Sequence, residues 1–324
     1  MRGLFAVAAA TAVALSLQAS CVFAQDSWPT KPITLVVPFA PGGNTDLIAR
    51  TIAPGLQERL GQPVIVENKP GAGGTIATAE VAAAAPDGYT MQIGDISTHA
   101  IAPNIYKNLT YDPRLNFAPV VQITSVSLVF VANPELGVNT VADLVALAKK
   151  DPDALSYASS GIGSPQHLAF EYFKSKTGIT PVHIPYNGSA PALTDVIAGH
   201  VSMMIDGTAV PHVKNGALKA LAVTSDKRSK ALPDVPTMKE AGVPDYVFTS
   251  WHGVFFPAGV PEEIVTKVNE AINEILQEEA VQKRFADLNI GITGGTPADF
   301  SRFVGAEGDK MKPLVAISGA SQNQ

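Results

Sequence analysis

Pro38-Phe39-Ala40-Pro41-Gly42-Gly43-Asn44-Thr45-Asp46 is the stretch that decides the fold. It follows the apolar run Ile33-Thr34-Leu35-Val36-Val37 and precedes apolar residues that recur every fourth position, the spacing of one helix face: Ile48, Ile52, Leu56 and Leu60. The expected order is strand, loop, helix. Unpaired backbone N–H groups and the positive end of the helix dipole meet at such a loop, and adjacent glycines let a ligand approach the backbone. The loop suits a carboxylate or a phosphate, although βα turns of this composition also occur without a ligand.

Two further strands of the first half end in similar loops. Residues 63–67 are expected to form a strand that runs into Gly71-Ala72-Gly73-Gly74, with Thr75 as the cap of the next helix. Residues 89–93 are expected to form a third strand, which ends in the polar turn 94–99 with Ser97 and Thr98. In open α/β sheets, ligands bind beyond the carboxyl ends of the strands. Three consecutive strand ends of this kind therefore predict one ligand site.

The second half of the chain repeats the pattern. Strands are expected at residues 155–158, 182–185, 201–205 and 218–224, and the first three are followed by loops of small and polar residues. Thr140-x-x-Asp143 predicts a capping box, and Ser164 with Pro165 predicts a helix start that Gly178 ends. Two more helices are expected, from residue 261 to about 276 and from Thr296-Pro297 onward.

Two long apolar segments, residues 120–131 and 247–256, are long enough to run from one series of strands to the other. The expected fold is therefore α/β with two lobes joined by two crossover strands and the ligand cleft between them. We assign residues 25–125 and 247–324 to the first lobe and residues 126–246 to the second.

The N-terminus predicts export. Arg2 precedes an uncharged apolar run, and Val22-Phe23-Ala24 is a small-x-small cleavage site, so residues 1–24 are expected to be a signal peptide. Cys21 suggests a lipoprotein instead, but Gln18 stands where a lipobox has Leu or Val, which favours cleavage after Ala24 and a periplasmic protein without cysteine. No later apolar stretch approaches the ~20 residues of a membrane span. The net charge of −6 disfavours nucleic acid.

Catalytic, cofactor and metal motifs are not complete in this sequence. Gly161-x-Gly163-Ser164 has glycine in place of the nucleophile of a Gly-x-Ser-x-Gly elbow. The Gly71-Ala72-Gly73-Gly74-Thr75-Ile76 segment lacks the last glycine of a dinucleotide fingerprint, and no Walker loop is present. The six histidines show no metal-ligand spacing. We expect a binding protein, with no catalytic residue, no cofactor and no metal.

Several candidate residues have a structural interpretation as well. Asp46 would also stabilise the helix dipole as an acid in the first turn, and Asp206 would also hold a loop. Ser164 would serve equally well as a cap alone, and His167 would equally pack inside. Arg and Lys are nearly absent from these loops, so an anionic ligand must be bound by backbone N–H groups, hydroxyls, helix dipoles and bridging water.

Many of these motifs occur together, and in this order, in a known family. The motifs are Trp28-Pro29-Thr30-Lys31-Pro32-Ile33, the 38–46 loop, Gly71-Ala72-Gly73-Gly74, Pro86-Asp87-Gly88-Tyr89-Thr90, Tyr111-Asp112-Pro113, Ser159-Ser160-Gly161-Ile162-Gly163-Ser164-Pro165-Gln166-His167, Pro185-Tyr186-Asn187-Gly188-Ser189-Ala190-Pro191-Ala192-Leu193, Leu221-Ala222-Val223-Thr224-Ser225, Leu232-Pro233-Asp234-Val235-Pro236-Thr237 and Pro257-Ala258-Gly259-Val260-Pro261. Together they closely resemble the Bug-type (TctC family) solute receptors. These are the extracytoplasmic binding subunits of tripartite tricarboxylate transporters. The resemblance covers essentially the whole mature chain.

The resemblance implies a type II periplasmic binding fold that closes over a small carboxylate. It further implies delivery to a membrane permease of one large and one small subunit. We expect a monomer that binds a dicarboxylate, aliphatic or of the phthalate kind. His252, after Trp251, has no counterpart that we can place in the family pattern. Ligand contacts are expected from both lobes: Phe39, Ala40, Gly42, Gly43, Asp46, Gly73, Gly74, Ser97, Thr98, Ser160, Gly163, Ser164, Gln166, Tyr186, Asn187, Asp206, Thr208 and His252.

Two other functions are compatible with the same residues. The first keeps the fold but presents the ligand to a membrane sensor instead of a permease. The second is a secreted α/β hydrolase, which needs a nucleophile paired with a base.

Overall fold

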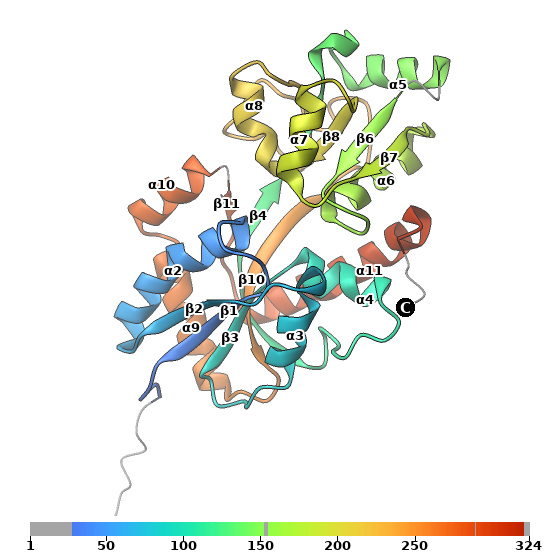
Figure 1. Ribbon diagram of the computed structural model, residues 1–324. Helices are drawn as coiled ribbons and strands as arrows, with labels where there is room; N and C mark the ends of the chain where they lie inside the picture. Colours follow the sequence, from blue (N-terminus) through green and yellow to red (C-terminus); the bar gives the residue numbers. More distant parts are fainter. Residues whose placement is uncertain (1–27, 152–154, 289, 321–324) are drawn as a thin grey trace, which may run out of the picture.

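The computed structural model describes residues 28–151, 155–288 and 290–320. The expected signal peptide, with Cys21, lies outside the described residues. Within these ranges, no helix is long and apolar enough to cross a membrane. The chain forms two α/β lobes, each built on its own sheet (Figure 1).

The first lobe contains a six-stranded sheet in the order β11-β4-β10-β3-β1-β2. Its strands are β1 (Ile33–Val37), β2 (Val64–Asn68), β3 (Thr90–Asp95), β4 (Phe117–Ser127), β10 (Thr249–Pro257) and β11 (Gly291–Ile292). β1 pairs in parallel with β2 and β3, whereas β10 is antiparallel to β3 and β4. The helices of this lobe are α2 (Asn44–Leu60), α3 (Thr75–Ala82), α4 (Ala102–Ile105), α9 (Glu262–Ile275) and α10 (Glu279–Asp287).

The second lobe contains a five-stranded sheet in the order β7-β6-β8-β5-β9. Its strands are β5 (Val129–Ala132), β6 (Ser156–Ser159), β7 (Val182–Pro185), β8 (Met203–Asp206) and β9 (Lys219–Val223). Its helices are α5 (Val141–Lys150), α6 (Pro165–Thr177), α7 (Ser189–Ile197) and α8 (Val210–Lys214). Because β6, β7 and β8 are parallel, the loops after them lie at one edge of this sheet.

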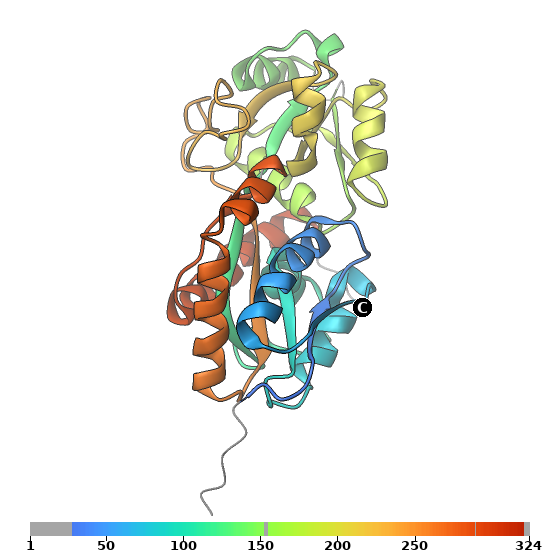
Figure 2. The ribbon, with the colours of Figure 1, turned by 90° about the vertical axis from the view of Figure 1, so that its left-hand side faces the viewer.

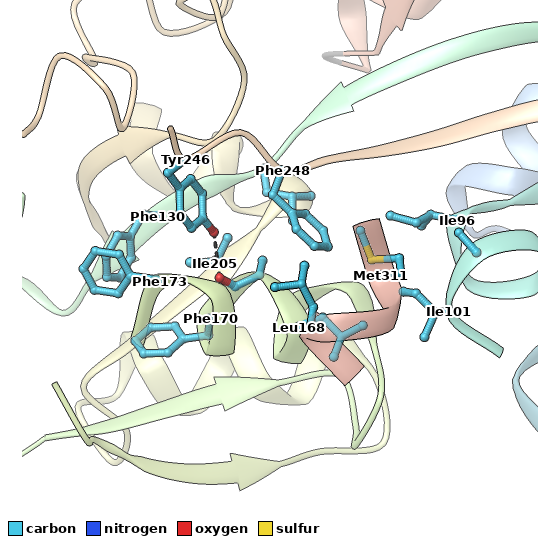
Figure 3. Packing of buried hydrophobic residues seen from close by; sticks show 14 of the residues in the cluster. Ile96, Ile101, Phe130, Leu168, Phe170, Phe173, Ile205, Tyr246, Phe248 and Met311 are labelled. Atoms are coloured by element: carbon cyan, nitrogen blue, oxygen red, sulfur yellow. Dashed lines mark hydrogen bonds between the residues drawn. The ribbon is translucent and has the colours of Figure 1, made fainter. Parts of the chain in front are cut away.

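Two segments of chain run between the lobes. The first continues from β4 into β5, and the second returns through β10 (Figures 1 and 2). A third connection is made by packing, because α11 (Pro297–Ser318) lies along the first lobe and also contacts α6 of the second. Figure 3 shows Met311 of α11 in the apolar cluster that holds Leu168 on one side and Ile101 on the other. The apolar core is therefore continuous across the junction of the lobes.

The sequence signals for helix starts and ends are mostly confirmed. Thr140 and Asp143 form the expected capping box, Thr296 caps α11, and Ser164 caps α6, which ends at Gly178. The prediction for Thr75 is wrong, because Gly74 holds the cap position and the Thr75 hydroxyl bonds back to the Ala72 carbonyl.

The sequence patterns did not predict α10 (Glu279–Asp287). α10 follows α9 after a short break and begins at Glu279 without a side-chain cap at Glu278. A helix of nine residues without a side-chain cap gives little sequence signal of where it begins. For this reason no separate helix was predicted there.

Candidate functional site

A cavity of about 620 Å³ lies between the two lobes. Its wall contains backbone and side chains from the strand-end loops of both sheets and from β10, as the following set shows: Phe39, Ala40, Pro41, Gly43, Asn44, Thr45, Gly73, Asp95, Ser97, Ile101, Ala102, Ile105, Tyr106, Ser160, Gly161, Ile162, Gly163, Ser164, Pro165, Gln166, Gly188, Ser189, Ser250 and His252. The wall includes no Lys or Arg among the described residues. Its polar groups are hydroxyls, amides, backbone atoms, one carboxylate and one imidazole.

A second cavity, of about 680 Å³, lies on the second lobe at the edge strand β9. It is lined by segments within residues 134–141, 213–221 and 234–241. None of the predicted ligand contacts lies in its wall. The cavity between the lobes is the better candidate, since the strand-end loops of both sheets meet there.

The glycine-proline loop after β1 is held by a buried carboxylate. Asp46 is 3% exposed and accepts hydrogen bonds from Gly42 N at 2.8 Å, Asn68 Nδ2 at 2.9 Å and Arg50 Nε at 2.9 Å. Asn68 also donates to the carbonyl of Phe39. Burial alone would raise the pKa of Asp46, but the hydrogen bonds and the Arg50 charge lower it below the usual value. Asp46 therefore keeps its negative charge and fixes the loop from behind, outside the cavity wall.

This loop presents the start of α2 to the cavity. Gly43 is the N-cap residue, with an ordinary φ of −76° and no side-chain cap, and Asn44 and Thr45 of the first turn line the cavity. The first N–H groups of a helix have no partner within the helix and face the positive end of its dipole. An anion placed here would be bound by backbone groups.

The loop after β2 requires glycine for close packing. Gly74 has a φ of +92°, and a Cβ there would lie 2.7 Å from Thr98 Cγ2 and 3.2 Å from Pro38 Cβ. Gly74 thus lets the loops after β1, β2 and β3 pack together, and its neighbour Gly73 lines the cavity.

The turn after β3 contains a carboxylate that the sequence analysis did not select. Asp95 lines the cavity and accepts hydrogen bonds from the backbone N–H and the hydroxyl of Thr98, both at 3.0 Å. Burial raises its pKa to about 6, against the opposing effect of the hydrogen bonds from Thr98 and Ser97. Its position as the last residue of a strand, before Ser97 and Thr98, is the signal that could have identified it.

In the second lobe, a hydrogen-bonded chain connects the loops after β6, β7 and β8. Ser160 Oγ donates to Gln166 Oε1 at 2.7 Å, and Gln166 Nε2 donates to Asp206 Oδ2 at 2.8 Å. Ser189 Oγ also donates to Asp206 Oδ2, and Asp206 Oδ1 accepts from Thr208 N. Asp206, like Asp46, is buried and turned into the protein, while Ser160, Gln166 and Ser189 line the cavity.

Two stacked histidines lie beneath the loop after β6. His167 Nδ1 accepts a hydrogen bond from Gly163 N at 3.1 Å, and its ring stacks on His183 with centroids 4.1 Å apart. His183 in turn bonds to Ser159 Oγ at 2.7 Å. Burial lowers the pKa of both rings, for His183 to about 4, and the neighbouring His167 and Lys174 lower the pKa of His183 further. His167 packs inside, one of the two roles expected for it.

His252 lies on β10 at the floor of the cavity. It is 4% exposed, and its Nδ1 lies 2.9 Å from the hydroxyl oxygen of the fully buried Thr124. Burial lowers its pKa to about 4, so the ring is neutral at pH 7.

The predicted contacts divide into two groups. Those in the cavity wall are Phe39, Ala40, Gly43, Gly73, Ser97, Ser160, Gly163, Ser164, Gln166 and His252. Those behind or beside the wall are Gly42, Asp46, Gly74, Thr98, Tyr186, Asn187, Asp206 and Thr208. Several of the second group bond within the protein instead, as Tyr186 does by donating its hydroxyl to Asp195.

The wall also contains residues that were not predicted: Pro41, Asn44, Thr45, Asp95, Ile101, Ala102, Ile105, Tyr106, Gly161, Ile162, Pro165, Gly188, Ser189 and Ser250. Most of them adjoin a predicted contact along the chain. Ile101, Ala102, Ile105 and Tyr106 come instead from the short helical segment after β3, whose approach to the cleft has no local sequence signal.

Comparison with known proteins agrees with this architecture. The family model described as the tripartite tricarboxylate transporter family receptor (TctC) matches residues 48–319. The chain belongs to this receptor family. It is 38% identical over 298 residues to protein BugT of Bordetella pertussis, a match that covers 91% of each chain. No group of His, Cys, Asp or Glu among the described residues has the arrangement of a metal site.

Solved structures of this receptor family have the same fold. Rpa4515 of R. palustris, determined with adipate, is 39% identical with a TM-score of 0.81, covering 90% of this chain and 98% of that one. MatC of Rhodopseudomonas palustris, determined with bound malate, is 34% identical with a TM-score of 0.78, covering 89% and 100%. The periplasmic binding protein BugD is 35% identical with a TM-score of 0.78, covering 91% and 99%. The prediction of a two-lobed periplasmic binding fold is confirmed.

Proposed function

We propose that this receptor captures a small carboxylate in the periplasm, between its two lobes, and delivers it to a membrane permease of one large and one small subunit. The observation that carries the proposal is the interlobe cavity, which offers a helix N-terminus, glycine loops and hydroxyls to a ligand. The relatives that were determined with adipate and with malate support a carboxylate as the ligand class. The same proposal includes three further points. The lobes divide at residues 125/126 and 246/247, the signal peptide is cleaved, and the receptor is a monomer.

The mechanism is recognition by a preorganised site whose described wall contains no Lys or Arg. The ligand carboxylate lies against the loop of residues 39–45 at the start of α2, where unpaired N–H groups and the helix dipole favour negative charge. Asp46 and Asp206 hold the loops of the two lobes in place before the ligand arrives. Less ordering is then needed on binding, which favours affinity.

Release to a permease follows from closure of the lobes. A ligand that contacts the 39–45 loop on one lobe and Ser160, Ser164 or Gln166 on the other favours the closed form, because only that form makes both sets of contacts. The permease would then bind the closed form and reverse the closure. A sensor that recognises the closed form would use the same contacts, so this alternative differs only in the partner.

The hydrolase alternative has little support in the geometry. The Ser159–His183 pair is within hydrogen-bond distance at 2.7 Å, but Ser159 is fully buried and lies outside the cavity wall. His252 Nδ1 bonds to Thr124, and no described serine of the wall bonds to His252. Nucleophilic catalysis requires a serine and its base in contact at the substrate.

The test is a thermal-shift screen of the purified mature protein against mono- and dicarboxylates, amino acids and sugars, followed by calorimetry on the hits. A carboxylate that binds only the folded state stabilises it by about 2.7 kcal/mol at a hundredfold excess over its Kd. If sugars raise the melting temperature and no compound with a carboxylate group does, the proposed ligand class is wrong.

A further inference from the structure

His252 occupies a special place in the cavity floor. Strand β10 lies between β3 and β4, and His252 is in register with Asp95 on one neighbour and Thr124 on the other. Directly paired residues on neighbouring strands project from the same face of a sheet. With no Lys or Arg in the described wall, His252 is the side chain there that combines a ring N–H with the capacity to carry positive charge.

The hydrogen-bond partners of Thr124 determine which ring nitrogen of His252 carries the proton. The Thr124 hydroxyl is fully buried, and its one hydrogen bond within the described structure joins it to His252 Nδ1. If Nδ1 carried the proton, the Thr124 hydroxyl oxygen would accept a hydrogen bond from Nδ1–H. The hydroxyl's own hydrogen would then be buried without an acceptor, which costs about 1–3 kcal/mol. If Thr124 donates to Nδ1, both groups are satisfied. The neutral ring then carries its proton on Nε2.

Nε2 is the ring nitrogen that is open to the cavity. It has no hydrogen bond to any described residue, and it is not one of the buried polar atoms that lack a partner, so solvent in the cavity reaches it. A side chain that is 4% exposed therefore presents an N–H donor, held in one orientation by Thr124, to the space that the ligand occupies. The matching group on the ligand is an oxygen atom that accepts a hydrogen bond from Nε2–H.

We propose that His252 determines which carboxylates this receptor binds, by donating from Nε2–H to a second oxygen function of the ligand, either a hydroxyl or a second carboxyl group. The proposal rests on the proposed function, because the first carboxylate is taken to lie against the loop after β1. Thr124 is a positioning residue that acts through the His252 ring.

The strand order sets the distance between the two ends of such a ligand. β1 and β10 are separated by β3 alone, so the two strands lie two interstrand spacings apart, about 10 Å. The ligand therefore needs two oxygen functions joined by a short carbon chain, so that one end reaches the loop after β1 and the other reaches His252 on β10. Asp95, between them on β3, favours a hydroxyl that donates to its carboxylate, or a second carboxyl group that shares a proton with it.

The test compares three six-carbon ligands that differ at one end: hexanoate, 6-hydroxyhexanoate and adipate. Calorimetry gives their Kd values for the full mature receptor and for His252→Phe, His252→Gln and Thr124→Val. A site built to donate a hydrogen bond discriminates strongly against a ligand without the acceptor. We expect the wild-type receptor to bind one of the two oxygenated ligands at least about tenfold tighter than hexanoate.

The variants separate recognition from folding, because the measured quantity is a ratio of Kd values within one protein. His252→Phe is expected to reduce the preference to within about twofold, and His252→Gln, whose amide also donates, to retain part of it. Thr124→Val is expected to reduce it about three- to tenfold, since it removes one hydrogen bond that orients the ring. An unchanged ratio in His252→Phe overturns the proposal; if that variant does not fold, an unchanged ratio in Thr124→Val does so.

Two further outcomes distinguish this inference from the function on which it rests. If none of the carboxylates screened binds the wild-type receptor, the proposed function fails. If carboxylates bind but hexanoate binds as tightly as both oxygenated ligands, only the role of His252 fails. Nitrogen NMR of the ligand-free receptor tests the tautomer directly: a proton on His252 Nδ1 instead of Nε2 would contradict the geometry from which the donor was inferred.

Discussion

Gly43→Val tests the role of the loop after β1 with little damage to the fold. Gly43 has an ordinary φ of −76°, and a Cβ there meets only the Ala40 carbonyl, at 3.8 Å. The backbone and the surrounding protein therefore accept a side chain at this position. The residue nevertheless lines the cavity, so the added methyl groups extend into the space that we assign to the ligand carboxylate.

The expected effects on stability and on binding differ in size. Valine is a poorer N-cap residue than glycine, which costs about 1 kcal/mol and lowers the melting temperature by roughly 2–4 °C in a protein of this size range. Loss of one hydrogen bond to a charged ligand costs about 1.5–3 kcal/mol, which weakens the Kd by about 10- to 150-fold. Calorimetry with the best carboxylate from the screen measures the second effect, and a thermal melt without ligand measures the first.

Gly61→Ala is the matched control. Gly61 ends α2 in the left-handed conformation, with a φ of +72° and no heavy atom near its Cβ position, and it lies outside the cavity wall. Alanine there costs about 1–2 kcal/mol of stability, while the ligand affinity should stay at the wild-type value. If Gly43→Val binds the carboxylate within twofold of wild type, the ligand does not lie against this loop and the reasoning is refuted.

Three further variants or conditions test the structure around the site. Asp46→Asn should lower the free energy of unfolding by about 1–3 kcal/mol and weaken ligand binding, because it replaces one of the two acceptor oxygens that hold the loop by an N–H donor and removes the charge paired with Arg50; urea unfolding that matches wild type would contradict this. Met311→Ala should cost about 2–5 kcal/mol, since the side chain is fully buried between the lobes, and an unchanged urea midpoint would contradict that burial. For pH, His183 and His252 have folded pKa values of about 4 against about 6.5 when unfolded. The unfolded state therefore binds protons first, and the free energy of unfolding should fall as pH drops from about 6.5 to 4, by at most about 1.4 kcal/mol per pH unit for each ring. Asp95, with a folded pKa of about 6, opposes this loss of stability in part. A melting temperature that rises throughout the fall from about pH 6.5 to 4 would contradict the prediction that the histidine effect is the larger one.

Local signals in the sequence were enough for most of the fold. β1 and β7 have the predicted bounds, and the four apolar positions spaced along α2 are all buried. These predictions succeeded because hydrophobic periodicity and capping residues act within one element. The missed helix α10 has neither a cap nor a long pattern, and the packing of α11 against α6 joins elements that lie far apart in the chain. Such contacts depend on the assembled fold and leave no local pattern.

The cavity wall follows the predicted loops more closely than the predicted side chains. Residues of the loops after β1, β2, β3 and β6 and the β10 residue His252 line the cavity, and their contact with a ligand stays a prediction. In contrast, Tyr186 and Asp206 were selected for their position at strand ends, and the structure turns them toward Asp195 and Thr208. Position at a strand end identifies the edge of the sheet that faces the ligand. It does not specify whether a polar side chain points toward the ligand or back into the protein.

The two buried aspartates show why that distinction matters for an anion-binding protein. A carboxylate that faced the cavity would repel the ligand, whereas a carboxylate behind the loop accepts N–H groups and leaves others directed at the ligand. Asp46 does this for the first lobe through Gly42, and Asp206 does so for the second through Thr208 and Gln166. In each lobe a buried carboxylate thus fixes loops that line the cavity without itself lying in the cavity wall. Asp95 differs because it does line the cavity, and its raised pKa is the property that lets it take up a proton when a second carboxyl group lies beside it.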